Sequence, residues 1–483
     1  MAKSKRKKRE FLTAFSIIFI LIFGLGLVSH LLPKAQFIGD TIVDGSGVVG
    51  ASLSDILLSP ILGFENAIEV CIFVLVLGGF LKVVANTKAL ETGIEVLVRK
   101  LKGKELILIP ILMFLFSIGG TTYGMLEETV GFYALLSTTM VMAGMDTLVA
   151  SAVVLLGAGS GVLGSTINPF AVGVAVSALP ETVSVNQAVI IGIGIILWLT
   201  TYAISTFFVM RYAKKVIKRK GSTFLSIRER KNMQTEYGKS DNKEIAQATL
   251  TKNQKVTLVL FALTFVVMII GFIPWEEFGI KFFTSWTAWL TGLPLGSWYF
   301  YDAALWFLIM AIIIGVVNRD GEKKFVDTFI DGADDMVGVI LIIAIARGAS
   351  VLMQSTYIDN YIIYNAADAL RHVPMVLFTP LNYILHIILS VLVPSSSGLA
   401  TLSSPIIGPL AQELNYNVES TIMTMVAANG LVNLITPTCG AIMGGLALAK
   451  VEYPTWVRWA FKVVVTIAIV NIIILTIATL MLS

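Results

Sequence analysis

Four short polar segments interrupt the apolar stretches of this sequence, and their residue types suit the binding of small charged molecules. Two are rich in Gly, Thr and Ser (Gly119–Gly124 and Pro394–Gly398), and two contain Asn, Thr and Pro (Gly164–Pro169 and Asn433–Gly440). A helix that begins at such a break offers free N–H groups and a partial positive charge, which favour a carboxylate. The carbonyl groups of a helix that ends there suit a cation. The segments therefore predict a binding site for a small charged solute.

Several ionisable residues also lie within apolar stretches, where a charge costs roughly 2.5–3.5 kcal/mol at the centre of a bilayer. Glu127 and Glu128 follow the first polar segment, and we expect one of them to face the site, because successive helix positions point about 100° apart. Arg347 either binds a substrate carboxylate or is a structural counter-charge for an acid such as Glu69. We interpret His386 as a hydrogen-bonded packing residue.

The composition places these residues in a membrane. Of the 483 residues, 56% are apolar and 14% are charged, against about 25% in an average soluble domain, and the mean hydropathy is +0.85. This excludes a soluble enzyme and a nucleic-acid-binding chain, and predicts an all-α polytopic membrane protein. No HExxH, GxSxG or paired His/Cys spacing occurs, so we expect no enzyme activity, no cofactor and no metal site. Cys71 and Cys439 lie in apolar stretches and imply no disulfide framework.

A spanning helix needs roughly 20 apolar residues, which predicts two kinds of membrane segment. Full spans are expected at 11–32, 64–85, 187–210, 256–274, 301–318, 335–353 and 456–481. The regions 105–143 and 375–413 are split near their centres and are expected to be re-entrant hairpins, and 147–179 and 419–449 are expected to be broken spans.

The basic residues predict the orientation. Met1–Glu10 carries six Lys or Arg residues, and the linker 211–255 carries thirteen against four acids. The positive-inside rule therefore puts the N-terminus, the segment 86–104 and the basic linker in the cytoplasm. The basic segments all fall on the cytoplasmic side only if each hairpin enters the membrane and returns to the same side. The predicted orientation and the predicted hairpins therefore support each other. We expect a multi-pass protein of a bacterial inner membrane.

The order span, span, hairpin, broken span, span occurs twice, which predicts an inverted repeat. The first repeat covers 1–210 and the second covers 301–481, separated by the linker 211–255 and by a connecting span and external loop at 256–300. The positions Thr121 and Ser397 are 276 residues apart (397 − 121), and Asn168 and Pro437 are 269 apart (437 − 168). Paired helix interruptions in inverted repeats indicate a secondary transporter with a site near the bilayer midplane. The alternative is that these small residues only allow close helix packing.

The motifs GGTTYGMLEET, GSTINPFAVGVA, PSSSGLATLSSPIIGPLA and NLITPT occur in this order. Together they resemble the anaerobic C4-dicarboxylate carrier family over nearly the whole chain, and within it the YfcC-type branch, which is similar to bacterial arginine/ornithine antiporters. The resemblance implies an ion-transporter-superfamily fold, with a homodimeric scaffold domain and a transport domain that moves as an elevator. Relatives of the sodium/dicarboxylate class carry Ser-Asn-Thr at both tips. This chain has Gly-Thr-Thr and Ser-Ser-Ser, which leaves the coupling ion open.

These observations predict a secondary transporter of small charged metabolites, with arginine and ornithine as the expected exchange pair. The alternative is a carrier of C4-dicarboxylates, short-chain carboxylates or other amino acids, with Arg347 as the anion clamp. The predicted substrate-binding residues are Thr121, Thr122, Tyr123, Glu127, Glu128, Ser165, Thr166, Asn168, Arg347, Ser395, Ser396, Ser397, Asn433, Thr436 and Thr438.

Overall fold

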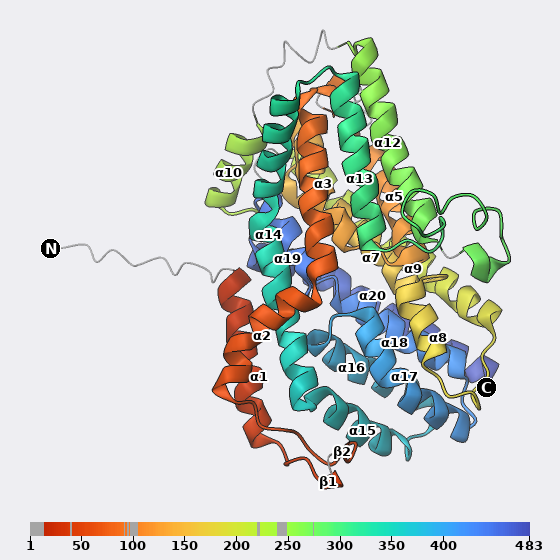
Figure 1. The fold of residues 1–483 in the computed structure, drawn as a ribbon. Helices are drawn as coiled ribbons and strands as arrows, with labels where there is room; N and C mark the ends of the chain where they lie inside the picture. Colours follow the sequence, from red (N-terminus) through yellow and green to blue (C-terminus); the bar gives the residue numbers. More distant parts are fainter. Residues whose placement is uncertain are drawn as a thin grey trace.

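The computed structural model describes residues 14–38, 41–90, 92–93, 96, 105–219, 223–238, 249–273 and 275–483 (Figure 1). The basic N-terminal segment 1–10, most of 91–104 and the residues 239–248 of the linker lie outside the described residues. The described chain is nearly all helical, apart from the short antiparallel strands β1 (Phe37–Ile38) and β2 (Thr41–Ile42).

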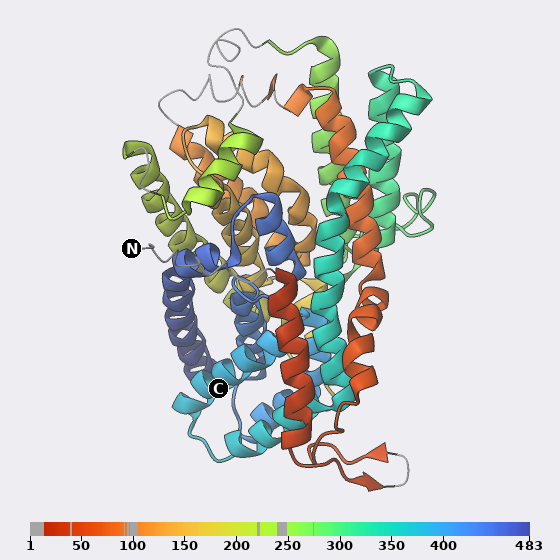
Figure 2. The ribbon, with the colours of Figure 1, turned by 90° about the vertical axis from the view of Figure 1, so that its left-hand side faces the viewer.

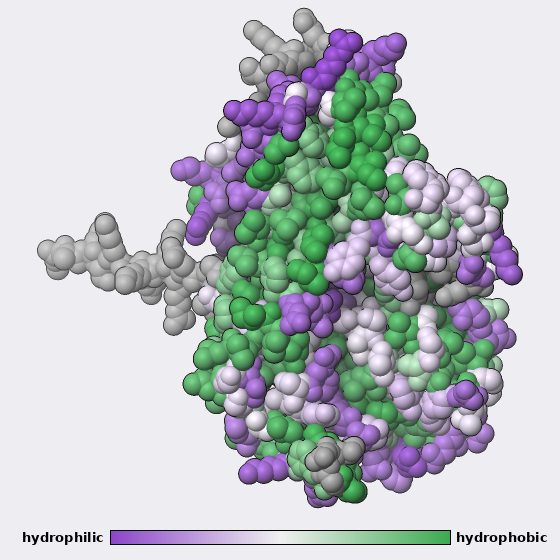
Figure 3. Space-filling model, viewed as in Figure 1, coloured by the Kyte–Doolittle hydropathy of each residue, from purple (hydrophilic) through white to green (hydrophobic). Residues whose placement is uncertain are grey.

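A helix lies over each of the seven full spans expected from the sequence. They are α1 (Ala14–Leu31), α3 (Ile68–Asn86), α9 (Gln187–Lys218), α12 (Lys252–Phe272), α13 (Phe300–Val317), α14 (Glu322–Thr356) and α20 (Tyr453–Leu482). Nine helices among the described residues are long and apolar enough to cross a membrane. They are the helices above except α1, together with α5, α7 and α16. Figure 3 shows the matching surface, with a broad hydrophobic region over α3 and α13 and hydrophilic residues at the two ends of the molecule.

The four interrupted regions form two helix–turn–helix pairs and two broken helices. The pairs are α5 (Leu108–Tyr123) with η2 (Glu127–Gly131) and α6 (Phe132–Met142), and α16 (Met375–Leu392) with α17 (Ser396–Glu413). The broken helices are α7 (Thr147–Gly164) with η3 (Pro169–Gly173) and α8 (Val174–Ser177), and α18 (Val418–Val432) with α19 (Gly440–Leu448). Every residue of α7 is buried, and so is every residue of α18 except Glu419 in its first turn, which suits helices at the centre of a helix group.

The helices pack in two groups. The long-helix group consists of α1, α2 (Leu53–Asn66), α3, α12, α13 and α14, in which α14 packs along both α2 and α3. The hairpin group consists of α5 to α9 and α16 to α20, with α7 and α18 in contact at its centre. Figure 2 shows α14 beside α2 and α3 on one side of the molecule, and α20 on the other. The two groups meet mainly where α14 contacts α19 and where α3 contacts η2.

Small residues set the closeness of packing inside the long-helix group. A Cβ atom on Gly332 of α14 would lie 2.4 Å from the carbonyl oxygen of Gly78 in α3. A Cβ atom on Gly63 of α2 would lie 2.3 Å from the backbone nitrogen of Gly348. Both contacts involve backbone atoms, so glycine is required where α14 crosses its two neighbours.

Four elements differ from the sequence-based expectation. The segment between the expected spans 11–32 and 64–85 contains most of α2, which begins where Ser52 and Asp55 form a capping box. The helix expected at 335–353 extends from Glu322 to Thr356. The basic linker contains α10 (Ile227–Tyr237), which begins at a second capping box, formed by Ser226 and Glu229. The short helix α15 (Ile358–Leu370) was also not expected.

The first hairpin tip also lies later than expected. Gly119 and Gly120 are inside α5, and the helix ends at Gly124, whose φ of +81° is a left-handed conformation that favours glycine. The reason is packing, because a Cβ atom on Gly120 would lie 2.1 Å from the carbonyl oxygen of Ala158 in α7. For Gly120, the small-residue packing alternative describes the structure, whereas a Cβ atom on Gly119 would meet only the side chain of Met125.

Candidate functional site

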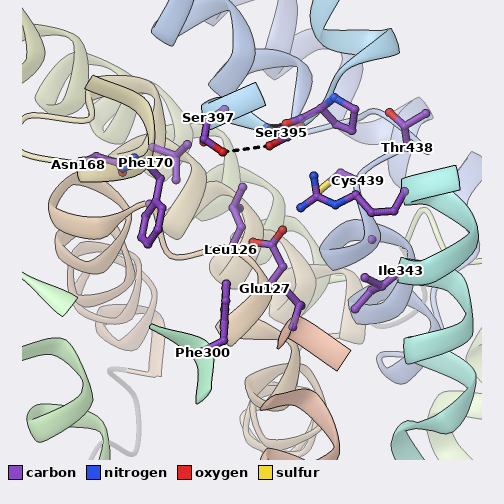
Figure 4. A pocket seen from close by; sticks show the side chains of 18 residues that line it. Leu126, Glu127, Asn168, Phe170, Phe300, Ile343, Ser395, Ser397, Thr438 and Cys439 are labelled. Carbon is purple, nitrogen blue, oxygen red and sulfur yellow. Dashed lines mark hydrogen bonds between the residues drawn. The ribbon is translucent and has the colours of Figure 1, made fainter. Parts of the chain in front are cut away.

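All four helix interruptions contribute residues to one cavity of about 150 Å³ between the two helix groups. From the hairpin group it is lined by Gly124, Leu126, Glu127, Val162, Asn168, Phe170, Pro394, Ser395, Ser396, Ser397, Asn433, Thr438, Cys439 and Gly440. From the long-helix group it is lined by Val70, Phe300, Ile343 and Arg347. Figure 4 shows the carboxylate of Glu127 pointing towards the serine tip, with Phe170 and Phe300 on one side and Thr438 and Cys439 on the other.

The second hairpin brings the N-terminus of a helix to this cavity. Ser395 is the N-cap of α17, and its hydroxyl accepts a hydrogen bond from the backbone N–H of Gly398 at 3.3 Å. The Ser395 and Ser397 hydroxyls lie 3.3 Å apart. The N–H groups of the first helical turn have no intrahelical acceptor and carry the positive end of the helix dipole. This end of the cavity therefore suits an anion.

The break between α18 and α19 holds that tip in place. Asn433 Nδ2 donates to the carbonyl oxygen of Pro394 at 2.9 Å, and the hydroxyl of Thr438 donates to the carbonyl oxygen of Val391 at 3.0 Å. The other amide atom, Asn433 Oδ1, has no hydrogen-bond partner in the described part of the chain, although Asn433 is only 5% exposed. A buried acceptor without a partner costs about 1–3 kcal/mol, so this oxygen suits a ligand that donates a hydrogen bond.

Two opposite charges share the cavity without an ion-pair partner. Glu127 and Arg347 are both half-buried, and no described side chain forms an ion pair with either within 4.0 Å. Because charges are costly away from water, each of them favours a ligand group of the opposite sign. A solute that carries both a carboxylate and an ammonium group would match this arrangement.

The structure brings together eight of the predicted site residues and leaves five others outside the cavity. Those inside are Glu127, Asn168, Arg347, Ser395, Ser396, Ser397, Asn433 and Thr438. Those outside are Thr121, Thr122, Ser165, Thr166 and Thr436. Of the remaining two, Tyr123 and Glu128, the side chains lie outside the described residues.

The hydroxyl groups of the five outer residues form hydrogen bonds within the chain itself, and a role for them in substrate binding stays a prediction. Thr121 and Thr166 hydrogen-bond to each other at 3.1 Å and so connect the first hairpin to the first break. Thr122 donates to the carbonyl oxygen of Ile118, Ser165 accepts from Asn168 Nδ2, and Thr436 lies 2.6 Å from the Thr438 hydroxyl. They shape the breaks that carry the lining residues.

Sequence reasoning missed the apolar part of the lining. Phe170 follows the first break directly, and Phe300 is the first residue of α13, whose sequence neighbour Tyr299 packs against Phe170 with ring centroids 5.8 Å apart. An aromatic residue at a break in a span was a usable signal for Phe170. No sequence signal distinguished Phe300 from the aromatic residues around it. Among the described residues, no group of three His, Cys, Asp or Glu residues is placed to hold a metal ion.

Two relatives match most of the chain. A putative basic amino acid antiporter of Escherichia coli K12, YfcC, is 26% identical over 406 residues, which are 82% of this chain and 74% of that protein. An uncharacterized protein of Haemophilus influenzae is 28% identical over 427 residues, which are 88% of this chain and 78% of that protein.

Two solved structures also match most of the chain. The YdaH transporter of Alcanivorax borkumensis is 14% identical with a TM-score of 0.47, and the match covers 96% of this chain and 98% of that one. Neisseria gonorrhoeae MtrF, of a class of antimetabolite efflux pumps, is 15% identical with a TM-score of 0.46, and the match covers 97% of this chain and 95% of that one. The profile of the C4-dicarboxylate anaerobic carrier family, DcuC, matches residues 13–480. Because that match spans nearly the whole sequence, the chain belongs to the DcuC family and is a multi-pass membrane transporter rather than an enzyme.

Proposed function

We propose that this transporter exchanges basic amino acids across a bacterial inner membrane, taking up arginine while it releases ornithine. The observation that carries this proposal is the cavity beside the N-terminus of α17, in which neither Glu127 nor Arg347 has an ion-pair partner among the described residues. An amino acid supplies both the anion and the cation that such a cavity favours. The printed name of the E. coli relative, a putative basic amino acid antiporter, supports the same class of substrate.

The proposed binding pose follows from the polarity of the cavity. The α-carboxylate lies at the N-terminus of α17, where the Ser395 to Ser397 hydroxyls and Arg347 can donate hydrogen bonds. The cationic side chain lies against the carboxylate of Glu127. Asn433 Oδ1 is the remaining acceptor and suits the α-ammonium group.

The same charges give a reason for obligatory exchange. An empty cavity that closes carries two unpaired charges into surroundings of low dielectric constant, which is costly, whereas a bound amino acid neutralises them. The loaded cavity can therefore move between the two sides more easily than the empty one. We propose that the hairpin group carries the cavity past the long-helix group in an elevator motion. A homodimer and a cytoplasmic N-terminus remain predictions.

Uptake of labelled arginine into proteoliposomes tests the function. We expect uptake when the vesicles contain ornithine and little uptake when they are empty. Glu127→Gln should reduce exchange by about tenfold or more, since the lost charge-assisted contact contributes about 1.5–3 kcal/mol. Glu181→Gln, at an exposed position outside the cavity, is the matched control. Equal uptake into empty vesicles would contradict exchange, and no uptake under either condition would contradict the substrate. Glu128→Gln decides whether the second glutamate also contributes.

A dicarboxylate carrier is the second candidate, because Arg347 and the N-terminus of α17 both favour anions and the family is named for such substrates. The two candidates differ in which substitution does more damage. A basic amino acid exchanger loses more activity with Glu127→Gln, and a dicarboxylate carrier loses more with Arg347→Gln. Arg458→Gln, at an exposed position on α20, is the control for the loss of a guanidinium group.

A further inference from the structure

A second cavity lies on the same interface between the two helix groups. Its volume is about 270 Å³, near the lower end of the range of about 300–1,000 Å³ that is typical of small-molecule sites. It is lined by Gly78, Leu81, Lys82, Ala85, Leu90, Gly131, Ala134, Leu135, Thr138, Glu236, Tyr237, Gly332, Asp335, Met336 and Leu448. The elements α3, α14, η2 and α19 therefore line both cavities.

The two cavities are in line along these shared elements. On α3, Val70 lines the central cavity and Lys82 lines the second one. On the antiparallel α14, Arg347 lines the central cavity and Asp335 lines the second one. Twelve helical residues correspond to about 18 Å. Leu81 and Gly131 both line the second cavity, and they pack so closely that a Cβ atom added to Gly131 would lie 2.6 Å from Leu81 Cδ1. The shared elements thus connect the two cavities along one potential path.

The second cavity has an apolar body and one unpaired charge at its rim. Lys82 and Asp335 neutralise each other, with Nζ and Oδ2 2.7 Å apart. Glu236 is the charged lining residue that has no ion-pair partner within the described part of the chain. The inner wall consists of aliphatic side chains such as Leu81, Leu135 and Met336. An aliphatic amine matches both properties, with its chain on the wall and its ammonium group at Glu236.

The backbone of Glu236, whose side chain is exposed, is held in place because α10 is attached to the hairpin group. The Tyr237 hydroxyl donates to the carbonyl oxygen of Leu448 at 2.5 Å. Burial, and after it the charge of Glu236, raises the pKa of Tyr237 to about 12, so the hydroxyl remains a donor. At the other end of α10, the buried Glu229 carboxylate accepts from the Glu452 backbone N–H at 2.8 Å and from the Thr455 hydroxyl at 3.1 Å.

We propose that this second cavity binds small aliphatic amines through Glu236, as a second station for the basic amino acid that the central cavity transports. The identity of the amine rests on the proposed function. The ammonium headgroup of a lipid offers the same chemistry, so the experiment must separate a free amine from a lipid.

Protection of a single thiol from alkylation tests the proposal. In full-length protein with Cys71→Ser and Cys439→Ser, Thr138→Cys places a thiol in the cavity, and Thr235→Cys places one next to Glu236 but outside the lining. We expect ornithine at about ten times its Kd to slow the reaction of N-ethylmaleimide with the thiol at 138 by about tenfold, since the free fraction falls as 1/(1 + [L]/Kd). The thiol at 235 should react at an unchanged rate.

Two further substitutions separate this site from the central one. Protection at 138 should persist with Glu127→Gln, which disables the central cavity under the proposed function, and should disappear with Glu236→Gln. Protection that disappears with Glu127→Gln would overturn the second station and leave the proposed function standing. Failure of the proposed function appears separately, as the absence of arginine/ornithine exchange in proteoliposomes.

The same thiol at position 138 also tests whether a lipid occupies the cavity. In nanodiscs of phosphatidylglycerol without phosphatidylethanolamine, ornithine should protect the thiol at 138 as it does in detergent. If phosphatidylethanolamine protects this thiol without ornithine, and ornithine adds nothing, the occupant is a lipid amine and the proposed station is wrong. No protection at 138 under any condition would also overturn it.

Discussion

At the scale of single residues, the partner of a polar side chain decides its role in this site. The Thr121 and Thr166 hydroxyls join the first hairpin to the first break, and the Thr436 hydroxyl contacts Thr438 within the second break, whereas Ser395 and Ser397 line the cavity. Asn433 combines both roles, because its Nδ2 holds the second tip and its Oδ1 has no hydrogen-bond partner within the described ranges. Residue type alone cannot separate these roles, since the same hydroxyl and amide groups serve both.

The contact between His386 and Ser403 gives a prediction at this scale. The buried imidazole Nε2 lies 2.6 Å from the Ser403 hydroxyl, and Nδ1 lies 2.8 Å from the carbonyl oxygen of Asn382, so His386 joins α16 to α17. Ser403→Ala leaves the buried Nε2 without a partner and should cost about 1–3 kcal/mol, seen as a lower Tm in detergent. Ser285→Ala, at an exposed position, should leave the Tm unchanged. An unchanged Tm for Ser403→Ala would show that this contact does not hold the hairpin.

At the scale of elements, the glycine residues of α14 have different consequences along one helix. A Cβ atom on Gly332 would meet the backbone oxygen of Gly78, whereas one on Gly338 would have nothing within 4 Å. Gly332→Ala should therefore force α3 and α14 apart and cost about 1–3 kcal/mol. Gly338→Ala should be neutral or stabilising by about 0.5–1 kcal/mol, because alanine favours the helix. The comparison of both Tm values checks the prediction, and equal shifts would contradict it.

The sequence was sufficient for the membrane class and for the positions of the spans, because long apolar stretches need no knowledge of tertiary contacts. It was insufficient for α2, whose apolar residues follow a loop with two acids, Asp40 and Asp44, and whose start depends on the Ser52–Asp55 capping box. It also misplaced the first tip, because Gly119 and Gly120 could equally well form a turn or a tight helix crossing. That choice depends on α7, which lies elsewhere in the chain.

Prediction of the candidate site followed the same division. Glu127, Asn168, Arg347, Asn433 and the serine tip were identifiable because polar groups are exceptional in apolar stretches. Val70, Phe300 and Ile343 were not, since they are apolar residues among many and reach the cavity only through the packing of the two helix groups. For the polar residues and the apolar residues alike, a role in substrate binding remains a prediction.

At the scale of the whole molecule, the central cavity is shared by two groups of helices that touch over a limited set of elements. Arg347 and Ile343 come from the long-helix group, and Glu127 and the two hairpin tips come from the other. A displacement of one group against the other would therefore change which side chains surround the solute. An elevator motion requires this interface to slide, and a covalent connection across it should stop transport.

The contact between Ile343 and Gly440 provides such a connection. A Cβ atom on Gly440 of α19 would lie 3.0 Å from Ile343 Cβ and 2.9 Å from Ile343 Cα on α14. These distances are shorter than the roughly 3.5–4.5 Å between the Cβ atoms of a disulfide, so the bond forms once the two helices move slightly apart. With Cys71→Ser and Cys439→Ser as background, Ile343→Cys combined with Gly440→Cys should exchange arginine for ornithine when reduced and lose exchange when oxidised. The single variants should not respond to oxidant. Because both positions line the cavity, only the difference between the oxidised and reduced forms of the same protein is interpretable. Exchange that continues in fully cross-linked protein would mean that the two groups do not move against each other during transport.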